Sequence, residues 1–149
     1  MDKQQRDEFN RRNVDEFRSS GGRIASFGDA PVLLLTTTGA RSGLARTSPM
    51  MYLADDAEPN RVYVFASAAG SDRNPAWFNN LVAHPDALTV EIGTETLSAR
   101  AEVLSEETRA AVFATQADRY PGFARYQEMT ERRIPAVALT LQRDDPTTV

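Results

Sequence analysis

Short runs of apolar and β-branched residues recur along the chain and are separated by turn residues, a pattern typical of a protein built mainly from β-strands. Six such runs predict six strands, over residues 31–38, 47–55, 61–67, 87–92, 95–104 and 134–143. The first, PVLLLTTT, is continuously apolar in its first half, so we expect it to be buried on both faces. In the second, Pro49 has no N–H to donate, which places it at an edge, a bulge or a strand start.

Residues 2–19 have the spacing of a helix rather than a strand. Phe9, Val14 and Phe17 fall within one arc of a helical wheel, with charged residues elsewhere. This thin apolar stripe could dock on the rest of the domain or lie on a membrane surface. We expect docking, because a membrane-surface helix usually has a wider apolar face.

Three further helices are predicted from their end signals. Asn74 is expected to cap a helix that has Pro75 in its first turn and ends near Ala83, before Pro85. Ser105 is expected to cap a helix that runs to Arg119. A short helix is predicted within residues 124–133.

The order of these elements indicates the fold class. The strands come in hairpins rather than in strict β-α-β alternation, so the sheet should be mainly antiparallel, and six such strands can close into a small barrel. We therefore expect a mainly β member of the α+β class, with short flanking helices. The 149 residues suggest one domain, 1–149, with residues 1–20 as an N-terminal helix and 144–149 as a frayed tail.

Composition excludes several classes of function. The formal net charge of −4 argues against broad nucleic-acid binding. The absence of cysteine excludes disulfides, thiolate zinc sites and cysteine nucleophiles. His84 is the sole histidine, so neither a metal site nor a serine triad built on Ser67 or Ser71 is expected. The polar N-terminus is not a secretory signal, and the cysteine-free composition is compatible with the cytoplasm.

The segment TTTGARSGLART, residues 36–47, raises the question of an anion site. It reads first as a hairpin turn, in which glycines supply positive φ. However, Arg41 and Arg46 flank the tip of the loop, Ser42, Thr47 and Ser48 add hydroxyl groups, and glycines let backbone N–H groups approach an anion. The spacing matches neither a Walker A loop nor a dinucleotide-binding fingerprint.

Two other segments allow a structural and a functional interpretation. The loop ASAAGSDRNP, residues 66–75, leads into a helix that carries Trp77 and Phe78; it could simply join a strand to a helix, or its small residues could make room for a flat ring. Tyr120, Phe123 and Tyr126 follow at intervals of three. They could form a helix face that packs on the barrel, or an aromatic wall over a substrate or cofactor.

Together these segments resemble a known family. FRSSGGRIASFGDAPVLLLTTTGARSGLARTSPMMYL, FASAAGSDRNPAWFNNLVAHP and YPGFARYQEMTERRIPAVALT, in this order and spacing, resemble the deazaflavin (coenzyme F420)-dependent nitroreductase family. The resemblance runs from about Phe9 to Thr140. It implies the split β-barrel shared with flavin-mononucleotide oxidases, and transfer of a hydride from reduced F420 to a quinone, nitroaromatic or similar acceptor.

The resemblance also implies a set of site residues. Residues expected to hold the phosphate, the acidic tail and part of the ring of the coenzyme are Arg41, Ser42, Gly43, Arg46, Thr47, Ser48, Pro49, Met50, Met51 and Tyr52. Residues expected to line the deazaflavin are Ala66, Ser67, Ala68, Ala69, Ala76, Trp77, Phe78, Asn79, Asn80 and Phe123. Ser67, Tyr120 and Tyr126 are the candidate catalytic residues and, with Tyr52, are expected to face the acceptor.

The chain departs from the family pattern at three places. Ala69 stands where the family commonly has glycine, the turn reads GAR where arginine and lysine are commonly found together, and Phe123 stands where tyrosine is frequent. The last change leaves open any proton-donor role at that position.

Several alternatives remain at the level of sequence. The chain could be an FMN-dependent oxidoreductase on the same barrel, or a carrier that binds the deazaflavin or another ligand without catalysis. We expect a small-molecule electron acceptor as partner and no nucleic acid. A cytoplasmic protein is expected, as a monomer or homodimer, with peripheral membrane contact through residues 1–20 as a further possibility.

Overall fold

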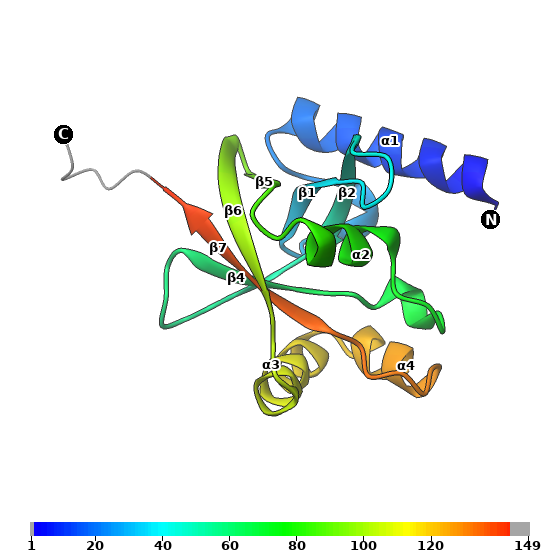
Figure 1. Cartoon of the computed structure of the whole chain (residues 1–149), viewed down its shortest axis with the longest axis vertical. Helices are drawn as coiled ribbons and strands as arrows, with labels where there is room; N and C mark the ends of the chain where they lie inside the picture. The colour runs from blue at the N-terminus through cyan, green and yellow to red at the C-terminus, as the bar shows by residue number, and fades with distance from the viewer. Residues whose placement is uncertain (1, 144–149) are drawn as a thin grey trace.

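The computed structural model describes residues 2–143, so the predicted tail at 144–149 lies outside the described residues. Its body is one antiparallel sheet with the strand order β2-β1-β5-β6-β7-β4-β3 (Figure 1). The strands are β1 (Val32–Thr38), β2 (Ala45–Met51), β3 (Leu53–Ala54), β4 (Arg61–Phe65), β5 (Leu88–Ile92), β6 (Glu95–Val103) and β7 (Ala136–Gln142). Every neighbouring pair is antiparallel, as the hairpin pattern predicted.

The sheet curls because its two edges are consecutive in the chain. β2 lies at one edge and β3 at the other, yet only Tyr52 separates them. Met51 and Leu53 are two residues apart, so their Cα atoms lie within about 7 Å of each other. The two edges therefore meet at this point, which gives the split-barrel architecture. The described sheet has seven strands rather than the predicted six, because the run 47–55 divides at Tyr52 and its last part pairs with β4.

Within residues 2–143, four helices surround the barrel: α1 (Lys3–Ser20), α2 (Ala76–Ala83), α3 (Glu106–Arg119) and α4 (Gly122–Glu128). The same described residues contain two short 3₁₀ turns that were not predicted, η1 (Ala25–Phe27) and η2 (Ala68–Gly70). α1 packs on β2 and α2 on β1, whereas α3 packs on β7 and on α4. Figure 1 shows α1 at the top of the barrel, α3 and α4 together at the bottom, and α2 between them.

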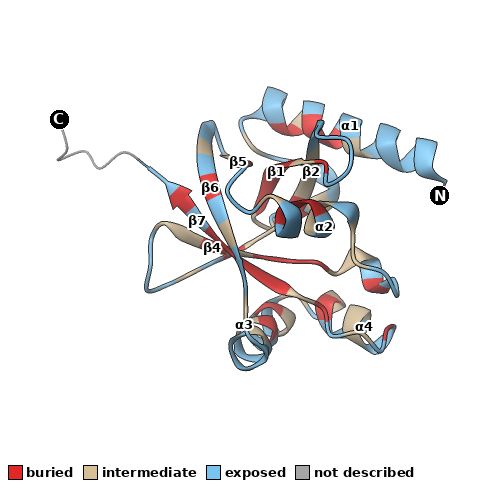
Figure 2. Cartoon of the chain, in the orientation of Figure 1, coloured by how far each residue is buried: buried red, intermediate tan, exposed pale blue. Residues whose placement is uncertain are grey.

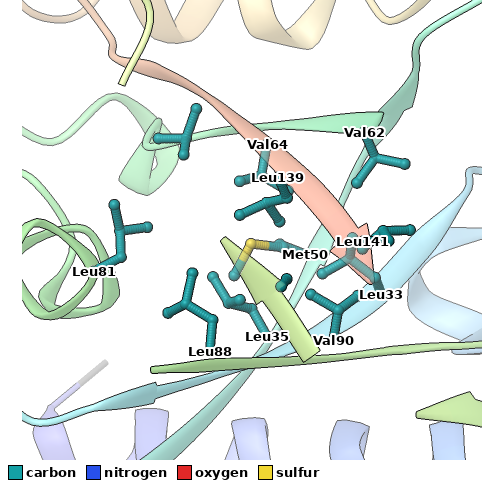
Figure 3. Packing of buried hydrophobic residues seen from close by; sticks show 12 residues of the cluster. Leu33, Leu35, Met50, Val62, Val64, Leu81, Leu88, Val90, Leu139 and Leu141 are labelled. Carbon is teal, nitrogen blue, oxygen red and sulfur yellow. The ribbon is translucent and has the colours of Figure 1, made fainter. Parts of the chain in front are cut away.

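The core explains why β1 is apolar without alternation. Leu33 and Leu35 point into the main cluster, which also contains Val64, Val90 and, from α2, Leu81 (Figure 3). Val32 and Leu34 point to the opposite face and pack against Val14 and Phe17 of α1 and against Ile24. β1 is therefore buried on both faces, as predicted (Figure 2). Full burial of a side chain such as Phe17 contributes about 1.5–3 kcal/mol.

The docking of α1 is confirmed, but its predicted stripe is shorter than expected. Val14 and Phe17 are buried, whereas Phe9 is 45% exposed. The N-terminal half of α1, to which Phe9 belongs, extends past the strands and is almost entirely exposed (Figure 2). The helix begins with a capping box, in which Asp2 and Gln5 each accept a hydrogen bond from the backbone of the other.

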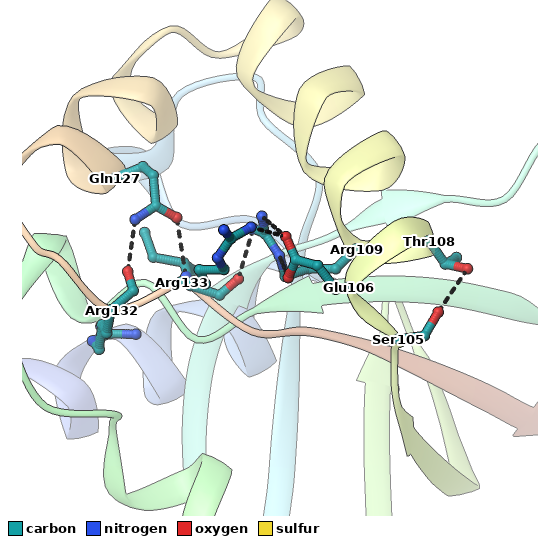
Figure 4. Close-up of polar contacts among 8 residues, drawn as sticks. Ser105, Glu106, Thr108, Arg109, Gln127, Arg132 and Arg133 are labelled. Carbon is teal, nitrogen blue, oxygen red and sulfur yellow. Dashed lines mark hydrogen bonds and ion pairs between the residues drawn. The ribbon is translucent and has the colours of Figure 1, made fainter.

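One predicted helix cap is wrong, and the other occupies its position without the expected hydrogen bond. The N-cap of α2 is Pro75 rather than Asn74, whose side chain instead accepts a hydrogen bond from Arg132. Ser105 does occupy the N-cap position of α3, but its hydroxyl donates to the Thr108 hydroxyl rather than satisfying a backbone N–H (Figure 4).

Candidate functional site

A groove of about 1440 Å³ lies between α1, the hairpin that joins β1 to β2, and α2. This volume exceeds the roughly 300–1,000 Å³ of a usual small-molecule site, so the groove has room for a large ligand. Nine of the residues predicted to bind a coenzyme contribute to its lining: Arg41, Ser42, Arg46, Thr47, Ser48, Ala76, Trp77, Asn79 and Asn80.

The hairpin has a defined turn. Leu44 accepts a hydrogen bond from the Gly39 N–H at 2.8 Å, and Gly39 accepts one from the Gly43 N–H at 2.9 Å. Gly43 has a φ of +71°, which is the role that the sequence assigned to glycine here. The Ser42 hydroxyl accepts a hydrogen bond from the Leu44 N–H at 3.1 Å, so its oxygen already stabilises the turn.

Asn80 fixes the hairpin to α2. Its carboxamide oxygen accepts a hydrogen bond from the Ala40 N–H at 3.0 Å, and its amide donates to the Thr37 hydroxyl at 3.1 Å. The side chain is only 8% exposed. At the base of the hairpin, the hydroxyl oxygens of Thr36 and Thr47 lie 2.7 Å apart. The loop that carries Arg41 is therefore held in one position relative to the groove.

The hairpin wall of the groove carries two exposed guanidinium groups, those of Arg41 and Arg46. Within residues 2–143, neither Arg41 nor Arg46 forms an ion pair. The α1 wall adds charges of both signs, including Lys3 and Asp7. Arg18, at the far end of this wall, pairs with Glu91 of β5 at 2.9 Å, a hydrogen bond that raises the pKa of Arg18 against the opposing effect of burial. Arg41 and Arg46 therefore have their charges available for an anion.

Other residues on the predicted list lie outside this groove. Met50 is buried in the main core, and Pro49 and Tyr52 are half-buried. Burial raises the pKa of the Tyr52 hydroxyl, partly offset by the positive charge of Arg143. Phe78 packs against the main cluster from α2.

The aromatic triplet packs on the barrel. Phe123 is 8% exposed and meets Phe65 edge-on, with ring centroids 5.7 Å apart. Tyr126 packs on Phe123 at 5.6 Å, and Tyr120 and Met51 border the same cluster. These contacts are those of a helix face that packs on the barrel. A role of the three aromatic residues as a wall over the coenzyme ring stays a prediction.

The small-residue loop has an unusual backbone. Ala68 and Ala69 have positive φ values of 45° and 52°, in the left-handed region that non-glycine residues rarely adopt. Ser67 is half-buried at the start of the loop, and Ala66 is fully buried. The guanidinium of Arg132 donates hydrogen bonds to this loop. Sequence reasoning missed Arg132, because nothing in ERRIP distinguishes it from Arg133 before the fold is known.

The groove residues fit the anionic part of the coenzyme that the resemblance implies. Two guanidinium groups without an ion pair in the described part of the chain suit a phosphate and carboxylates, together with the hydroxyls of Thr47 and Ser48 and a fixed glycine turn. No group of three or more potential ligand side chains that could hold a metal ion occurs in the described residues. Nor does the part of the chain between residues 2 and 143 contain a helix long and apolar enough to cross a membrane.

Comparison with known proteins gives a consistent match. The family model described as F420H(2)-dependent quinone reductase matches residues 9–141. The protein Rv3178 of Mycobacterium tuberculosis is 38% identical over 109 residues, which cover 73% of this chain and 88% of that protein. The F420H(2)-dependent quinone reductase Rv1261c of the same organism is 33% identical over 132 residues, 83% of this chain and 84% of the relative.

Solved structures give the same result. One described as an F420-H2 dependent reductase (FDR-A) superposes with a TM-score of 0.64 at 33% identity, covering 73% of this chain and 93% of its own. Another, described as a domain-swapped dimer, has a TM-score of 0.67 at 29% identity and covers 87% of this chain and 95% of its own.

Proposed function

Because the chain belongs to the F420H(2)-dependent quinone reductase family, we propose that it transfers a hydride from reduced coenzyme F420 to a quinone. The observation that carries this proposal is the groove beside the β1–β2 hairpin, where Arg41, on the loop that Asn80 fixes, and Arg46, at the start of β2, lie unpaired within the described residues. An acidic protein that presents two guanidinium groups on one hairpin is suited to an anionic coenzyme. Nitroaromatic compounds are further candidate acceptors, from the resemblance alone.

The hairpin residues bind the charged part of the coenzyme in this proposal. Arg41 and Arg46 pair with the phosphate and the acidic tail, and Thr47 and Ser48 donate hydroxyl hydrogen bonds to the same oxygens. Because the hairpin backbone is already fixed, binding has to order the two arginine side chains but not the loop that carries Arg41, which reduces its entropic cost. Trp77, half-buried in the groove wall, offers an apolar surface to the remainder of the molecule.

The ring end of the site is assigned to the loop Ala66–Ala69 and to Phe123. When bound, reduced F420 supplies the hydride. The quinone also takes up a proton to become a hydroquinone, and Ser67, Tyr120 and Tyr126 are the candidate donors, with water as the alternative. The chain contributes mainly by holding donor and acceptor in contact and excluding water, an effect that can be worth about 7–11 kcal/mol when the geometry is good.

The test is a fluorescence titration of the purified protein with F420 and, separately, with FMN, followed by steady-state oxidation of reduced F420 by menadione. We expect tighter binding of F420 and turnover that depends on both substrates. Binding without turnover would favour a carrier. Failure of the protein to bind either F420 or FMN would contradict the proposal.

The proposal includes a homodimer, which the relative described as a domain-swapped dimer supports. Light scattering of the purified chain distinguishes it from a monomer. Peripheral membrane contact through α1 is supported by the 45% exposure of Phe9. Sedimentation with anionic lipid vesicles tests that contact, and failure of the chain to sediment would contradict it.

A further inference from the structure

The guanidinium of Arg132 donates four hydrogen bonds to the loop Ala66–Asn74. Nη1 of Arg132 donates to the Ala66 carbonyl and to the Asn74 side-chain oxygen, each at 3.0 Å. Nη2 donates to the Ser67 carbonyl at 2.9 Å, and Nε donates to the Ser71 carbonyl at 2.8 Å. Lysine could not reproduce this arrangement, because its ammonium lacks the rigid planar fork of arginine.

The backbone of Arg132 is itself fixed from α4. The Gln127 amide donates to the Arg132 carbonyl at 2.7 Å, and the Gln127 oxygen accepts from the Ile134 N–H at 3.0 Å (Figure 4). The Arg132 N–H donates to the buried Thr130 hydroxyl at 3.2 Å. Arg132 therefore connects the loop to the helix that carries Phe123 and Tyr126.

The loop needs such support because its conformation is unfavourable. Left-handed conformations cost non-glycine residues roughly 1–2 kcal/mol each, and both Ala68 and Ala69 adopt them. Strained backbone of this kind persists only where surrounding contacts determine it. The three charge-assisted hydrogen bonds from Arg132 to carbonyls of the loop stabilise it in this strained conformation.

These bonds also orient two N–H groups. A trans peptide unit is planar, so its N–H points opposite to its C=O. The carbonyls of Ala66 and Ser67 point at Arg132, and the N–H groups in the same two peptide units, those of Ser67 and Ala68, therefore point away from it. Among residues 2–143, neither of these N–H groups donates a backbone hydrogen bond. The loop thus presents two adjacent, oriented donors on the side opposite Arg132.

We propose that Arg132 is a positioning residue that aims the N–H groups of Ser67 and Ala68 at hydrogen-bond-accepting atoms on the polar edge of the coenzyme ring. This inference rests on the proposed function, since it specifies how the loop Ala66–Ala69 would recognise the ring. Arg132 touches neither coenzyme nor acceptor in this arrangement. Arg132 acts by orienting the Ala66–Ser67 and Ser67–Ala68 peptide units.

The first test is a direct observation of the two amides by ¹H–¹⁵N NMR during addition of oxidised F420. We expect the Ser67 and Ala68 signals to move downfield, because a new hydrogen bond deshields an amide proton. If F420 binds and these two signals do not move, the inference is wrong. If F420 does not bind the wild-type chain at all, it is the proposed function that fails.

The second test compares Arg132→Lys and Arg132→Gln with Arg133→Gln. Arg133→Gln is the matched control, because it removes one positive charge at the adjacent residue, whose exposed side chain pairs with Glu106 instead of holding the loop. We expect Arg132→Gln to raise the Kd for F420 about tenfold and Arg132→Lys to raise it less, whereas Arg133→Gln stays within about twofold. Hydrogen exchange of the protein without coenzyme should accelerate at residues 66–74 in the Arg132 variants, and not in the hairpin 39–44.

A purely structural role of Arg132 would give a different result. It would lower the melting temperature but leave the Kd and the Ser67 and Ala68 shifts unchanged when measured well below that temperature. This outcome overturns the inference. If Arg132→Gln does not fold, Arg132→Lys decides by the same two measurements.

Discussion

The side chain of Asn80 accepts a hydrogen bond from the backbone N–H of Ala40 at 3.0 Å, and so joins a helix to the tip of a hairpin forty residues earlier in the chain. Sequence reasoning assigned Asn80 to the ring of the coenzyme. In the structure its side chain is directed to the hairpin, where it also donates to Thr37. Asn80 would therefore affect coenzyme binding indirectly, by fixing the loop that carries Arg41.

Asn80→Ala should lower the free energy of unfolding by about 1–3 kcal/mol, because it leaves the Ala40 N–H and the Thr37 hydroxyl without their buried partner. It should also raise the Kd for F420, since the hairpin becomes less ordered. Urea denaturation and fluorescence titration measure the two effects. The control is Asn79→Ala, an exposed neighbour, whose stability should change by less than about 0.5 kcal/mol. Equal stability of the two variants would contradict this role of Asn80.

The double variant Arg41→Ala with Arg46→Ala should raise the Kd for F420 about a hundredfold, because each of the two lost charge-assisted contacts contributes about 1.5 kcal/mol. The rate of hydride transfer in the coenzyme-saturated enzyme should change less than the Kd. Added salt should weaken wild-type binding more than that of the variant.

The matched control for this pair is Arg12→Ala with Arg23→Ala, two exposed arginines that do not line the groove. It removes the same net charge elsewhere on the surface. If both double variants shift the Kd equally, the effect is one of overall charge. An unchanged Kd in the Arg41 and Arg46 variant would show that the hairpin arginines take no part in coenzyme binding.

Gly70→Ala should destabilise the protein by about 2–4 kcal/mol. Its φ of +82° is unfavourable for alanine, and the new Cβ would lie 2.9 Å from the Met129 Cβ and 3.1 Å from the Tyr126 carbonyl oxygen. Gly21→Ala has a similar φ of +78° but meets only Thr94 at an ordinary 3.8 Å, so it should lose about 1–2 kcal/mol. Thermal unfolding compares the two, and equal losses would show that the loop does not pack tightly on α4.

Tyr63→Phe should destabilise the protein near neutral pH, and the difference from the wild type should shrink under acid conditions. The Tyr63 hydroxyl donates to Asp55 at 2.7 Å, and this bond is the main cause that holds the pKa of Asp55 below its usual range. A carboxyl with a lowered folded pKa stabilises the protein above its unfolded pKa of about 3.9 and loses that contribution as pH falls through the lower value. Urea denaturation from pH 7 to pH 3 measures this, and a pH-independent difference would contradict it.

The sequence determined most of the fold because local signals agreed with the tertiary structure. Continuous apolar character in β1 correctly indicated burial on both faces, and the hairpin spacing gave the antiparallel pairing. The division of the second strand at Tyr52 could not be predicted, because it follows from closure of the barrel. The misplaced cap at Asn74 has a similar cause: its side chain bonds to Arg132, a residue far along the chain.

The site was predictable to the extent that it depends on short segments. Nine of the predicted residues line one groove because the hairpin and α2 each carry several of them within a few positions. Residues that act through backbone contacts give no such signal. Arg132 is adjacent to another arginine with the same charge, and only the fold separates the one that holds the loop from the one that pairs with Glu106.

The strand order also has a consequence for synthesis on the ribosome. β4 pairs with the two-residue β3 on one side and needs β7 on the other, and β6 also has β7 as its second neighbour. Translation proceeds at about 5–20 residues per second, so β4 spends several seconds with one flank unpaired before Ala136–Gln142 leaves the exit tunnel. During this interval β4 has an unpaired edge, and such an edge favours pairing with another chain.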